Sequence, residues 1–256
     1  MRLTGNTVLV TGGGSGIGRG LAIALHEAGN RVVIAGRRVE ALQAVTHEHP
    51  GISFLRLDQS KRQSIHTFVD ELGRRHSDVN VVINNAGIMA LEDLSAPEPD
   101  VAEAVVATNL LGPILLTSLL MPTLKAQRHP AIINVTSALA FIPLAFAPTY
   151  SATKAAMHAY TESMRFQLRD SGIQVIEIAP PRVETDMQGP ADDDYTMSVE
   201  DFVDETLSLL ASQPDGGELI VKAARGLREA ERNGVYDEVF AAVNPDSLVA
   251  ARKEVL

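Results

Sequence analysis

Short apolar runs rich in β-branched residues recur along the chain and constrain its fold more than any other feature. They are NTVLV from residue 6, RVVIAG from 31, ISFLRL from 52, VNVVIN from 79, AIINVT from 131 and IQVIEIA from 173. Segments with helical periodicity lie between them, such as the one that carries Leu21, Leu25 and Ala28. Continuous apolar strands, each followed by a helix, are typical of a parallel sheet covered on both faces. The pattern predicts an α/β protein with a Rossmann-type, doubly wound parallel sheet.

The length of 256 residues fits a single domain spanning 1–256 with a large core. From about residue 216 we expect a C-terminal extension, with one strand in ELIVK and a helix in YDEVFAAV, packed on the sheet. The chain contains no cysteine, so neither a disulfide framework nor a thiolate metal site is predicted, and the cytoplasm is the expected location.

The charge and the apolar stretches argue against several classes of partner. A formal charge of −10 disfavours binding to nucleic acid or to anionic lipid, both of which require a positive surface. No signal peptide is expected, because MRLTGNTVLVTGGG passes directly into an apolar run and a glycine cluster. The apolar stretch Leu110–Leu124 is interrupted by Gly112, Pro113 and Pro122 and is shorter than the roughly 20 residues that span a bilayer, which predicts a buried or interface helix.

A glycine-rich turn, TGGGSGIG at residues 11–18, directly follows the first predicted strand and precedes a predicted helix. Glycines at 12, 16 and 18 allow a sharp turn and let a pyrophosphate approach the N–H groups at the helix N-terminus. The context is that of a dinucleotide site, although a tight turn without a ligand is the simpler alternative. We therefore predict cofactor contacts from Gly12, Ser15, Gly16, Ile17 and Gly18.

The second strand ends IAGRR, where a site that selects NAD usually carries an acid. Gly36 takes the place of that acid, and Arg37 and Arg38 follow. Guanidinium groups match a phosphate geometrically and keep their charge, so this pattern favours the 2′-phosphate of NADP(H). Two surface arginines at a strand end are the alternative. Asp58, after FLRL, is expected to accept a hydrogen bond from the adenine amine.

The motif YSATK places Tyr150 and Lys154 four residues apart, on one face of a helix. A nearby cation favours the ionised form of a phenol, so we expect Lys154 to lower the pKa of Tyr150 and make it a usable acid or base. By itself such a pair is more often a core phenol and a solvated charge, and the rest of the chain has to decide.

Together these residues resemble the compact, single-domain branch of the short-chain dehydrogenase/reductase family over nearly the whole chain. The shared motifs are TGxxxGxG, the NNAG of Asn84–Gly87, Asn109 in the next helix, Ser137 thirteen residues before Tyr150, and YxxxK. The stretches APPRVETDM and ERNGVYDEVFAAVN further resemble a subgroup of bacterial oxidoreductases named after the D-alanine transfer operon.

The resemblance implies a role for each matching residue. Tyr150 is the expected general acid/base, Lys154 binds the nicotinamide ribose, Ser137 holds the substrate oxygen, and Asn109 anchors a relay water through its carbonyl. Further cofactor contacts are implied for Asn85, Ala86, Gly87, Pro180, Val183 and Thr185. Pro181 stands where relatives commonly carry glycine, which predicts a stiffer nicotinamide loop.

The expected activity is the NADP(H)-dependent interconversion of a ketone or aldehyde and an alcohol, as in carbonyl reductases and alcohol dehydrogenases. An apolar substrate wall is predicted from Met89, Leu139, Phe141, Phe146 and Met187. We expect a homodimer or homotetramer through the helices that contain residues 110–124 and 150–168. The competing hypothesis is a dinucleotide-binding sensor or scaffold with vestigial catalysis.

Other candidates carry less weight. His47 and His49 lack a third metal ligand nearby, and no metal site is predicted. No histidine stands where a Ser–His–Asp hydrolase would need it after Ser137. The stretch Gln188–Tyr195 is either a flap over the pocket or a solvated loop, with its three aspartates facing water.

Overall fold

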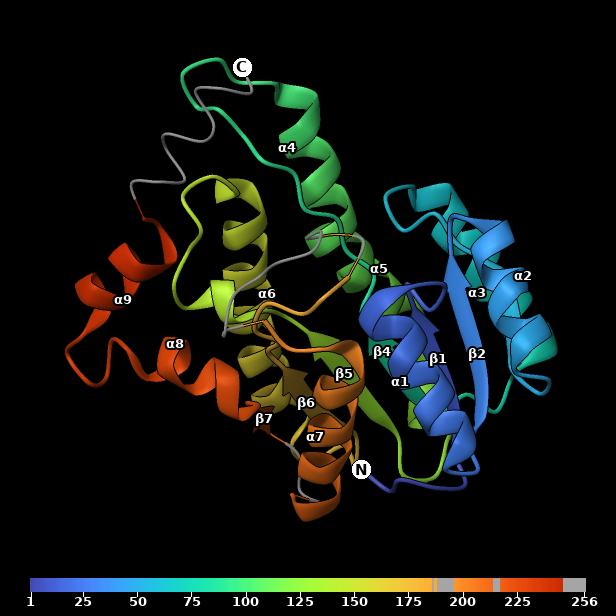
Figure 1. Cartoon of the computed structure of the whole chain (residues 1–256). Helices are drawn as coiled ribbons and strands as arrows, with labels where there is room; N and C mark the ends of the chain where they lie inside the picture. The colour runs from blue at the N-terminus through green and yellow to red at the C-terminus, as the bar shows by residue number, and fades with distance from the viewer. Residues whose placement is uncertain (186, 188–195, 214–216, 246–256) are drawn as a thin grey trace.

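The computed structural model describes residues 1–185, 187, 196–213 and 217–245. Within them, seven parallel strands form one sheet in the order β3-β2-β1-β4-β5-β6-β7 (Figure 1). The strands are β1 Thr7–Thr11, β2 Arg31–Gly36, β3 Ser53–Arg56, β4 Val81–Asn84, β5 Ala131–Val135, β6 Gln174–Ile178 and β7 Glu218–Leu219. The predicted fold class is therefore confirmed.

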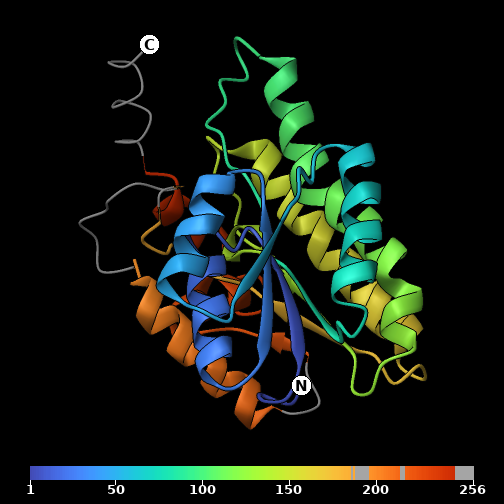
Figure 2. The same cartoon turned by 90° about the vertical axis from the view of Figure 1, so that its right-hand side faces the viewer.

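Helices cover both faces of this sheet (Figure 2). One face carries α1 Gly16–Glu27, α2 Val39–Glu48 and α7 Val199–Ser212, and the other carries α3 Arg62–Arg75, α5 Gly112–Lys125 and α6 Pro148–Leu168. Within β1, Val8 and Val10 pack on the first set, whereas Leu9 packs on the second. Successive strand residues point to opposite faces, so both must be apolar when both faces are covered.

The apolar stretch near residue 110 lies in a longer helical segment than the sequence predicted. Helix α4 Pro99–Val106, the π-helical turn η1 Ala107–Leu111 and α5 run on without a break over Pro99–Lys125. By length and composition alone this segment would suffice to cross a bilayer, because an 18-residue window within it has a mean hydropathy of 1.9. In the structure 44% of this 18-residue window is buried. Leu116, Leu120 and Leu124 pack in the core against the sheet.

The segment after residue 216 belongs to the sheet edge, as predicted. Strand β7 pairs with β6 in parallel, with Leu219 beside Ile178. The short helices η3 Lys222–Ala224, α8 Arg225–Glu229 and α9 Tyr236–Val243 follow at this edge (Figure 1). Asn244 at the end of α9 accepts a hydrogen bond from Ala145 N and donates one to Pro143 O, at 2.6 and 3.0 Å. The end of α9 is thereby tied to the loop that follows Ser137.

Strand order reverses between β1 and β4, because the chain leaves β1 toward β2 and β3 and then returns to the other side. In doubly wound sheets, ligands bind at the carboxyl ends of the strands beside such a switch point. The glycine-rich turn after β1, residues 85–87 after β4 and Ser137 after β5 all lie at this end of the sheet.

Candidate active site

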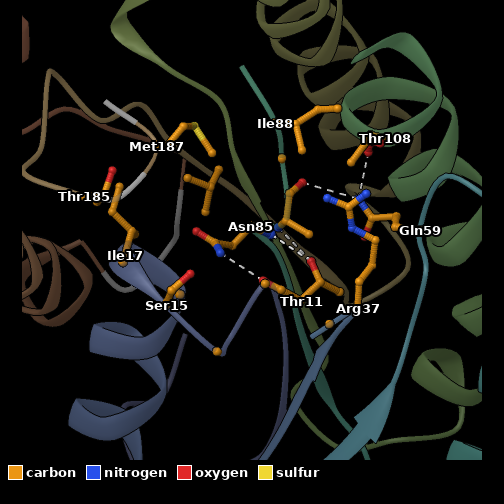
Figure 3. A pocket seen from close by; sticks show the side chains of 18 of the residues that line it. Thr11, Ser15, Ile17, Arg37, Gln59, Asn85, Ile88, Thr108, Thr185 and Met187 are labelled. Atoms are coloured by element: carbon orange, nitrogen blue, oxygen red, sulfur yellow. Dashed lines mark hydrogen bonds between the residues drawn. The ribbon is translucent and has the colours of Figure 1, made fainter. Parts of the chain in front are cut away.

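A pocket of about 220 Å³ lies at the switch point (Figure 3). Its wall combines the turn after β1, the ends of β2, β4 and β5, the first turns of α6 and the segment after β6. Most of the predicted cofactor residues line it: Gly12, Ser15, Gly16, Ile17, Gly18, Arg37, Arg38, Asn85, Ala86, Gly87, Tyr150, Lys154, Pro180, Val183 and Thr185. The structure thus brings together residues that are up to about 170 positions apart in the sequence.

The turn after β1 has the geometry of a phosphate cradle. Gly12 and Gly16 have φ angles of +71° and +51°, a region that side chains disfavour. A Cβ on Gly18 would lie 2.4 Å from Gly12 O and 2.3 Å from Asn85 Nδ2. Ser15, the N-cap of α1, forms no side-chain capping bond with the helix. Helix N-termini attract anions through their N–H groups and dipole, so the residues present fit a pyrophosphate.

Thr11 fixes the loop after β4 against this turn. Its hydroxyl accepts hydrogen bonds from the backbone N–H groups of Asn85 and Ala86, both at 3.0 Å, and its carbonyl accepts one from Asn85 Nδ2 at 2.9 Å (Figure 3). The sequence interpretation did not assign Thr11 a role, although its position at the end of the first strand was the available signal. Thr11 therefore sets the spacing between two walls of the pocket.

The cationic end of the pocket follows β2. Arg37 and Arg38 both line the wall, and Arg38 Nη2 donates to Ser15 Oγ at 2.8 Å. Figure 3 shows Arg37 extending along the wall toward Gln59. None of the described residues that line the pocket is acidic. A chain with a net charge of −10 therefore presents a locally positive pocket, which fits a phosphorylated ligand.

Asp58 does not line the pocket, contrary to its predicted position at the adenine. Its carboxylate accepts hydrogen bonds from Ser60 N and Ser60 Oγ, at 3.2 and 2.6 Å, and lies 3.8 Å from Lys61 Nζ. Burial alone would raise the pKa of Asp58, but the Ser60 bonds and the positive charges of Lys61 and Arg37 outweigh it and hold that pKa below its usual value. Asp58 is therefore already satisfied by its own loop.

Gln59 stands in the wall instead, a residue that the sequence interpretation missed beside Asp58. Its Nε2 donates to Thr108 O at 2.8 Å and to Ala86 O at 3.3 Å. Its Oε1 and the hydroxyl of Thr108 are buried without a hydrogen-bond partner, and both side chains line the pocket. Buried polar atoms normally have partners, so these two atoms are exceptions that lie beneath the surface of the pocket wall.

Three of the four predicted catalytic residues, Ser137, Tyr150 and Lys154, line the same pocket. Ser137 directly follows Thr136 at the end of β5, and Tyr150 and Lys154 come from the first turns of α6, which begins at Pro148. The Ser137 hydroxyl lies close enough to the Tyr150 hydroxyl to lower the pKa of that phenol. Lys154 Nζ donates to Val135 O at 2.8 Å and lies 5.5 Å from the centroid of the Tyr150 ring. All three side chains are at least nine-tenths buried.

The pKa of Tyr150 shifts in the direction opposite to the one predicted. Burial raises it to about 12, and the hydrogen bond with Ser137 offsets this only in part. The pKa of Lys154 is lowered to about 8 by burial, against an opposing effect of the Glu177 carboxylate. Low-dielectric surroundings disfavour the charged form of each group. The phenol therefore keeps its proton throughout the physiological range.

Asn109 holds the backbone after β4 rather than lining the pocket. It sits in the π-helical turn, where its Oδ1 accepts from Ile88 N and its Nδ2 donates to Ile88 O, both at 2.9 Å. Its Nδ2 also donates to Thr153 Oγ1 at 3.3 Å. Single π-turns inside α-helices occur frequently at functional sites. The predicted role of its carbonyl in a water relay stays a prediction.

The predicted apolar substrate wall is only partly in place. Met187 lines the pocket, while Met89 and Leu139 pack in the small cluster around Tyr150 without lining it. The prediction that Phe141 lines the pocket is wrong. Its ring packs edge-on against His158, with centroids 4.9 Å apart, and lies 4.6 Å from the Arg228 guanidinium. Phe146 is also absent from the pocket wall, and its carbonyl accepts a hydrogen bond from Glu92 N at 2.8 Å. The stretch Gln188–Tyr195 lies outside the described residues.

A glycine turn after the first strand, a locally positive pocket and a buried Ser–Tyr–Lys group at one switch point define an α/β protein with a Rossmann-type nucleotide pocket. Comparison with known proteins narrows this class. Residues 6–196 match the family model described as short chain dehydrogenase, so the chain belongs to that family of oxidoreductases. The resemblance predicted from the motifs is confirmed.

Individual relatives agree with this assignment. The chain is 37% identical over 251 residues to the uncharacterized oxidoreductase DltE of Bacillus subtilis, covering 95% of this chain and 98% of that protein. It is similar to the 3-ketoacyl-(acyl-carrier-protein) reductase of Brucella melitensis solved with NADH, at 26% identity and a TM-score of 0.78, covering 86% and 98% of the two chains. The alcohol dehydrogenase of Thermococcus sibiricus, solved with 5-hydroxy-NADP, shares the fold at 23% identity and a TM-score of 0.75, covering 84% and 95%.

Proposed function

We propose that the protein is an NADP(H)-dependent oxidoreductase that interconverts a small apolar ketone or aldehyde and its alcohol. The observation that carries this proposal is that Ser137, Tyr150 and Lys154 meet in the wall of the pocket that also contains the glycine turn, with Lys154 Nζ 5.5 Å from the centroid of the Tyr150 ring. Family membership supports the reaction class, and solved neighbours bind NADH or an NADP analogue.

The chain's own residues provide the binding and proton steps. The first turn of α1 would hold the pyrophosphate, Arg37 and Arg38 the 2′-phosphate, and Lys154 the nicotinamide ribose. When bound, the reduced nicotinamide supplies a hydride to the carbonyl carbon. The Tyr150 hydroxyl gives its proton to the carbonyl oxygen, which becomes the alcohol, and the Ser137 hydroxyl holds that oxygen in place. The resulting phenolate is stabilised by the Lys154 cation until it is reprotonated from solvent.

Cofactor and substrate preferences rest on narrower observations. The absence of an acidic group among the described residues of the pocket wall, together with Arg37 and Arg38, supports NADP(H) over NAD(H). Met187 in the wall, with Met89 and Leu139 near Tyr150, supports an apolar substrate. A cytoplasmic location remains a prediction.

Removal of the proton donor tests the reaction. In Tyr150→Phe, turnover with NADPH and any carbonyl compound reduced by the wild type is expected to fall by about 10²–10⁴-fold, the usual contribution of a general acid. NADPH affinity, measured by fluorescence titration, should stay near the wild-type value because the ring still fills its place.

Two outcomes would contradict the proposal. A Tyr150→Phe variant with full activity would show that the phenol is not the proton donor. A wild type that binds NADPH tightly but reduces nothing in a broad carbonyl panel would instead support a dinucleotide-binding sensor or scaffold. Tyr160→Phe is the matched control, because that half-buried tyrosine lies on the same helix and does not line the pocket.

A further inference from the structure

A carboxylate is buried directly behind the pocket, on strand β6. The side chain of Glu177 has no exposed surface. Its Oε1 accepts a hydrogen bond from Thr136 Oγ1 at 2.7 Å, and His158 Nδ1 lies 3.0 Å from Oε1 and 2.9 Å from Oε2. A buried carboxylate is costly unless it is paired and hydrogen-bonded. Glu177 meets that condition through one hydroxyl and one imidazole.

The imidazole belongs to the same helix face as the proposed catalytic residues. In α6, Tyr150, Lys154 and His158 follow one another at intervals of four residues, which places them in a row along one side of the helix. Tyr150 and Lys154 line the pocket, whereas His158 lies one turn further along and faces β6. Glu177 of β6 therefore lies against His158, one helical turn beyond Lys154.

Two contacts connect Glu177 to the pocket. Thr136, which donates to Glu177, itself lines the pocket wall. Lys154 donates to the carbonyl of Val135, the residue that precedes Thr136. The Glu177 carboxylate also raises the pKa of Lys154, in opposition to the lowering by burial. Glu177 does not line the pocket, but its carboxylate favours the charged form of Lys154, which does line it.

The imidazole of His158 is surrounded by carboxylates. Besides Glu177, the imidazole faces Glu162 of α6 at 3.8 Å and Glu218 of β7 at 3.9 Å, and the Phe141 ring covers it edge-on. Its pKa is raised, first by the hydrogen bond with Glu177 and then by the charges of Glu177, Glu162 and Glu218, against an opposing effect of burial. The imidazolium is thereby favoured, and it compensates the buried carboxylate.

A metal ion is the other reading of the cluster, because ligand atoms of His158, Glu177 and Glu218 lie within 4.8 Å of one another. However, Arg228 Nε already donates to Glu218 Oε1 at 2.7 Å, and the Thr136 hydroxyl already donates to Glu177. A guanidinium bound to one of the carboxylates would repel a metal cation. Ion pairing among the side chains therefore accounts for the cluster.

We propose that Glu177 is a positioning residue of the active site, whose buried carboxylate keeps the side chain of Lys154 in its ammonium form. The proposal rests on the proposed function, in which Lys154 binds the ribose and stabilises the phenolate. It adds a residue on β6 that acts through Lys154 and does not touch the reacting atoms. Thr136 and His158 support it by holding the carboxylate in a fixed position.

The test is the pH dependence of the Glu177→Gln variant. A lysine contributes as a cation below its pKa and loses that contribution as the pH rises through it, so wild-type kcat/KM for carbonyl reduction should fall on the alkaline side, around pH 8. Without the carboxylate, burial of Lys154 is unopposed and its pKa drops further. The alkaline limb of Glu177→Gln is therefore expected about one pH unit or more below that of the wild type.

A second readout does not require turnover. NADPH affinity is measured by fluorescence titration at a series of pH values above about 7, where the 2′-phosphate is doubly ionised and no longer contributes to the profile. The affinity of the wild type should decline as Lys154 deprotonates, and that of Glu177→Gln should decline at lower pH. If no carbonyl compound is turned over, the proposed function fails, and this measurement still decides the role of Glu177.

Matched variants separate charge from packing. Glu177→Asp keeps the carboxylate and should keep the limb near its wild-type position. Glu218→Gln removes a neighbouring acid of the same cluster and should leave the limb unchanged.

If Glu177→Gln does not fold, the double variant Glu177→Gln with His158→Gln leaves no unpaired charge in the pair, and its limb should also move to lower pH. Profiles of the single and double Glu177→Gln variants that superpose on the wild type would overturn the proposal, as would a Glu218→Gln shift of equal size.

Discussion

The phenol of Tyr150 and the ammonium of Lys154 are both buried, and burial moves both groups toward their neutral forms. The pKa of Tyr150 rises to about 12 and that of Lys154 falls to about 8. Below about pH 8 the phenol therefore keeps its proton and the lysine keeps its charge. These protonation states are the ones that the proposed reduction requires, with Tyr150 as the proton donor and Lys154 as the cation beside the phenolate that results.

Arginine side chains at the end of β2 decide the expected cofactor preference. The double variant Arg37→Ala with Arg38→Ala should bind NADPH about tenfold to a hundredfold more weakly, the loss expected for charge-assisted hydrogen bonds, with little change for NADH. Arg56→Ala is the matched control, since Arg56 ends the neighbouring strand β3 and does not line the pocket. Fluorescence titration with both cofactors gives the comparison, and equal losses for NADPH and NADH would contradict the assignment.

Gly36 allows the same preference to be tested in the opposite sense. A Cβ at this position would meet Leu42 at 3.6 Å, which is an ordinary contact, so a side chain fits there. Gly36→Asp is expected to favour NADH, because the carboxylate accepts from the ribose 2′-hydroxyl and repels a 2′-phosphate. An unchanged ratio of the two affinities would mean that the ribose lies elsewhere.

Helix α5 packs closely against Gln59 of the pocket wall at its first residue, Gly112. A Cβ at Gly112 would lie 2.4 Å from Gln59 O and 2.5 Å from Gln59 Cγ. Gln59 in turn bridges Thr108 O and Ala86 O, which connect the π-helical turn to the loop after β4. The start of α5 therefore has to be a glycine if Gln59 is to stay in the pocket wall.

Alanine at two helical glycines should separate this effect from helix propensity. Gly112→Ala is expected to lower the free energy of unfolding by about 1–3 kcal/mol through overpacking and to weaken NADPH binding by displacing Gln59. Gly73→Ala in α3, where a Cβ meets nothing within 4 Å, should raise the free energy of unfolding by about 0.5–1 kcal/mol and leave binding unchanged. Urea unfolding and NADPH titration measure both, and similar effects at the two positions would contradict this account.

The whole molecule leaves large apolar side chains exposed on the helices predicted to form an interface. Leu111 of the π-helical turn is 58% exposed and Phe166 of α6 is 67% exposed. The segment Pro99–Lys125 also leaves apolar surface exposed, since less than half of its most apolar 18-residue window is buried. Large apolar side chains that stay exposed mark candidate interaction surfaces. We propose that these helices form an isologous interface between copies of the chain.

Mass measurements test this interface. The wild type should behave as a dimer or tetramer of the 27.4 kDa chain in size-exclusion chromatography with light scattering. Leu111→Asp and Phe166→Asp should shift the population toward monomer, because a desolvated carboxylate has no partner there. Leu94→Asp, at an equally exposed leucine outside these helices, is the control and should leave the mass unchanged. A wild-type monomer at every concentration would refute the proposal.

The sequence by itself determined the features that depend on local spacing. Apolar runs fixed the strands, the glycine turn after β1 fixed the phosphate cradle, and the four-residue interval put Tyr150 and Lys154 on one side of α6. These features are predictable because helix and strand periodicity determine which neighbours share a face. The parallel strands then bring their carboxyl ends together at one edge of the sheet.

Only the tertiary structure decided which residues from distant parts of the chain contact each other and how deeply each side chain is buried. Phe141 packs on His158 and Arg228 from distant elements, Gln59 replaces Asp58 in the pocket wall, and Glu177 meets His158 across the β6–α6 interface. Desolvation likewise depends on every atom packed around a group, so the spacing in YSATK predicted the contact between Tyr150 and Lys154 but gave the wrong direction for the Tyr150 pKa.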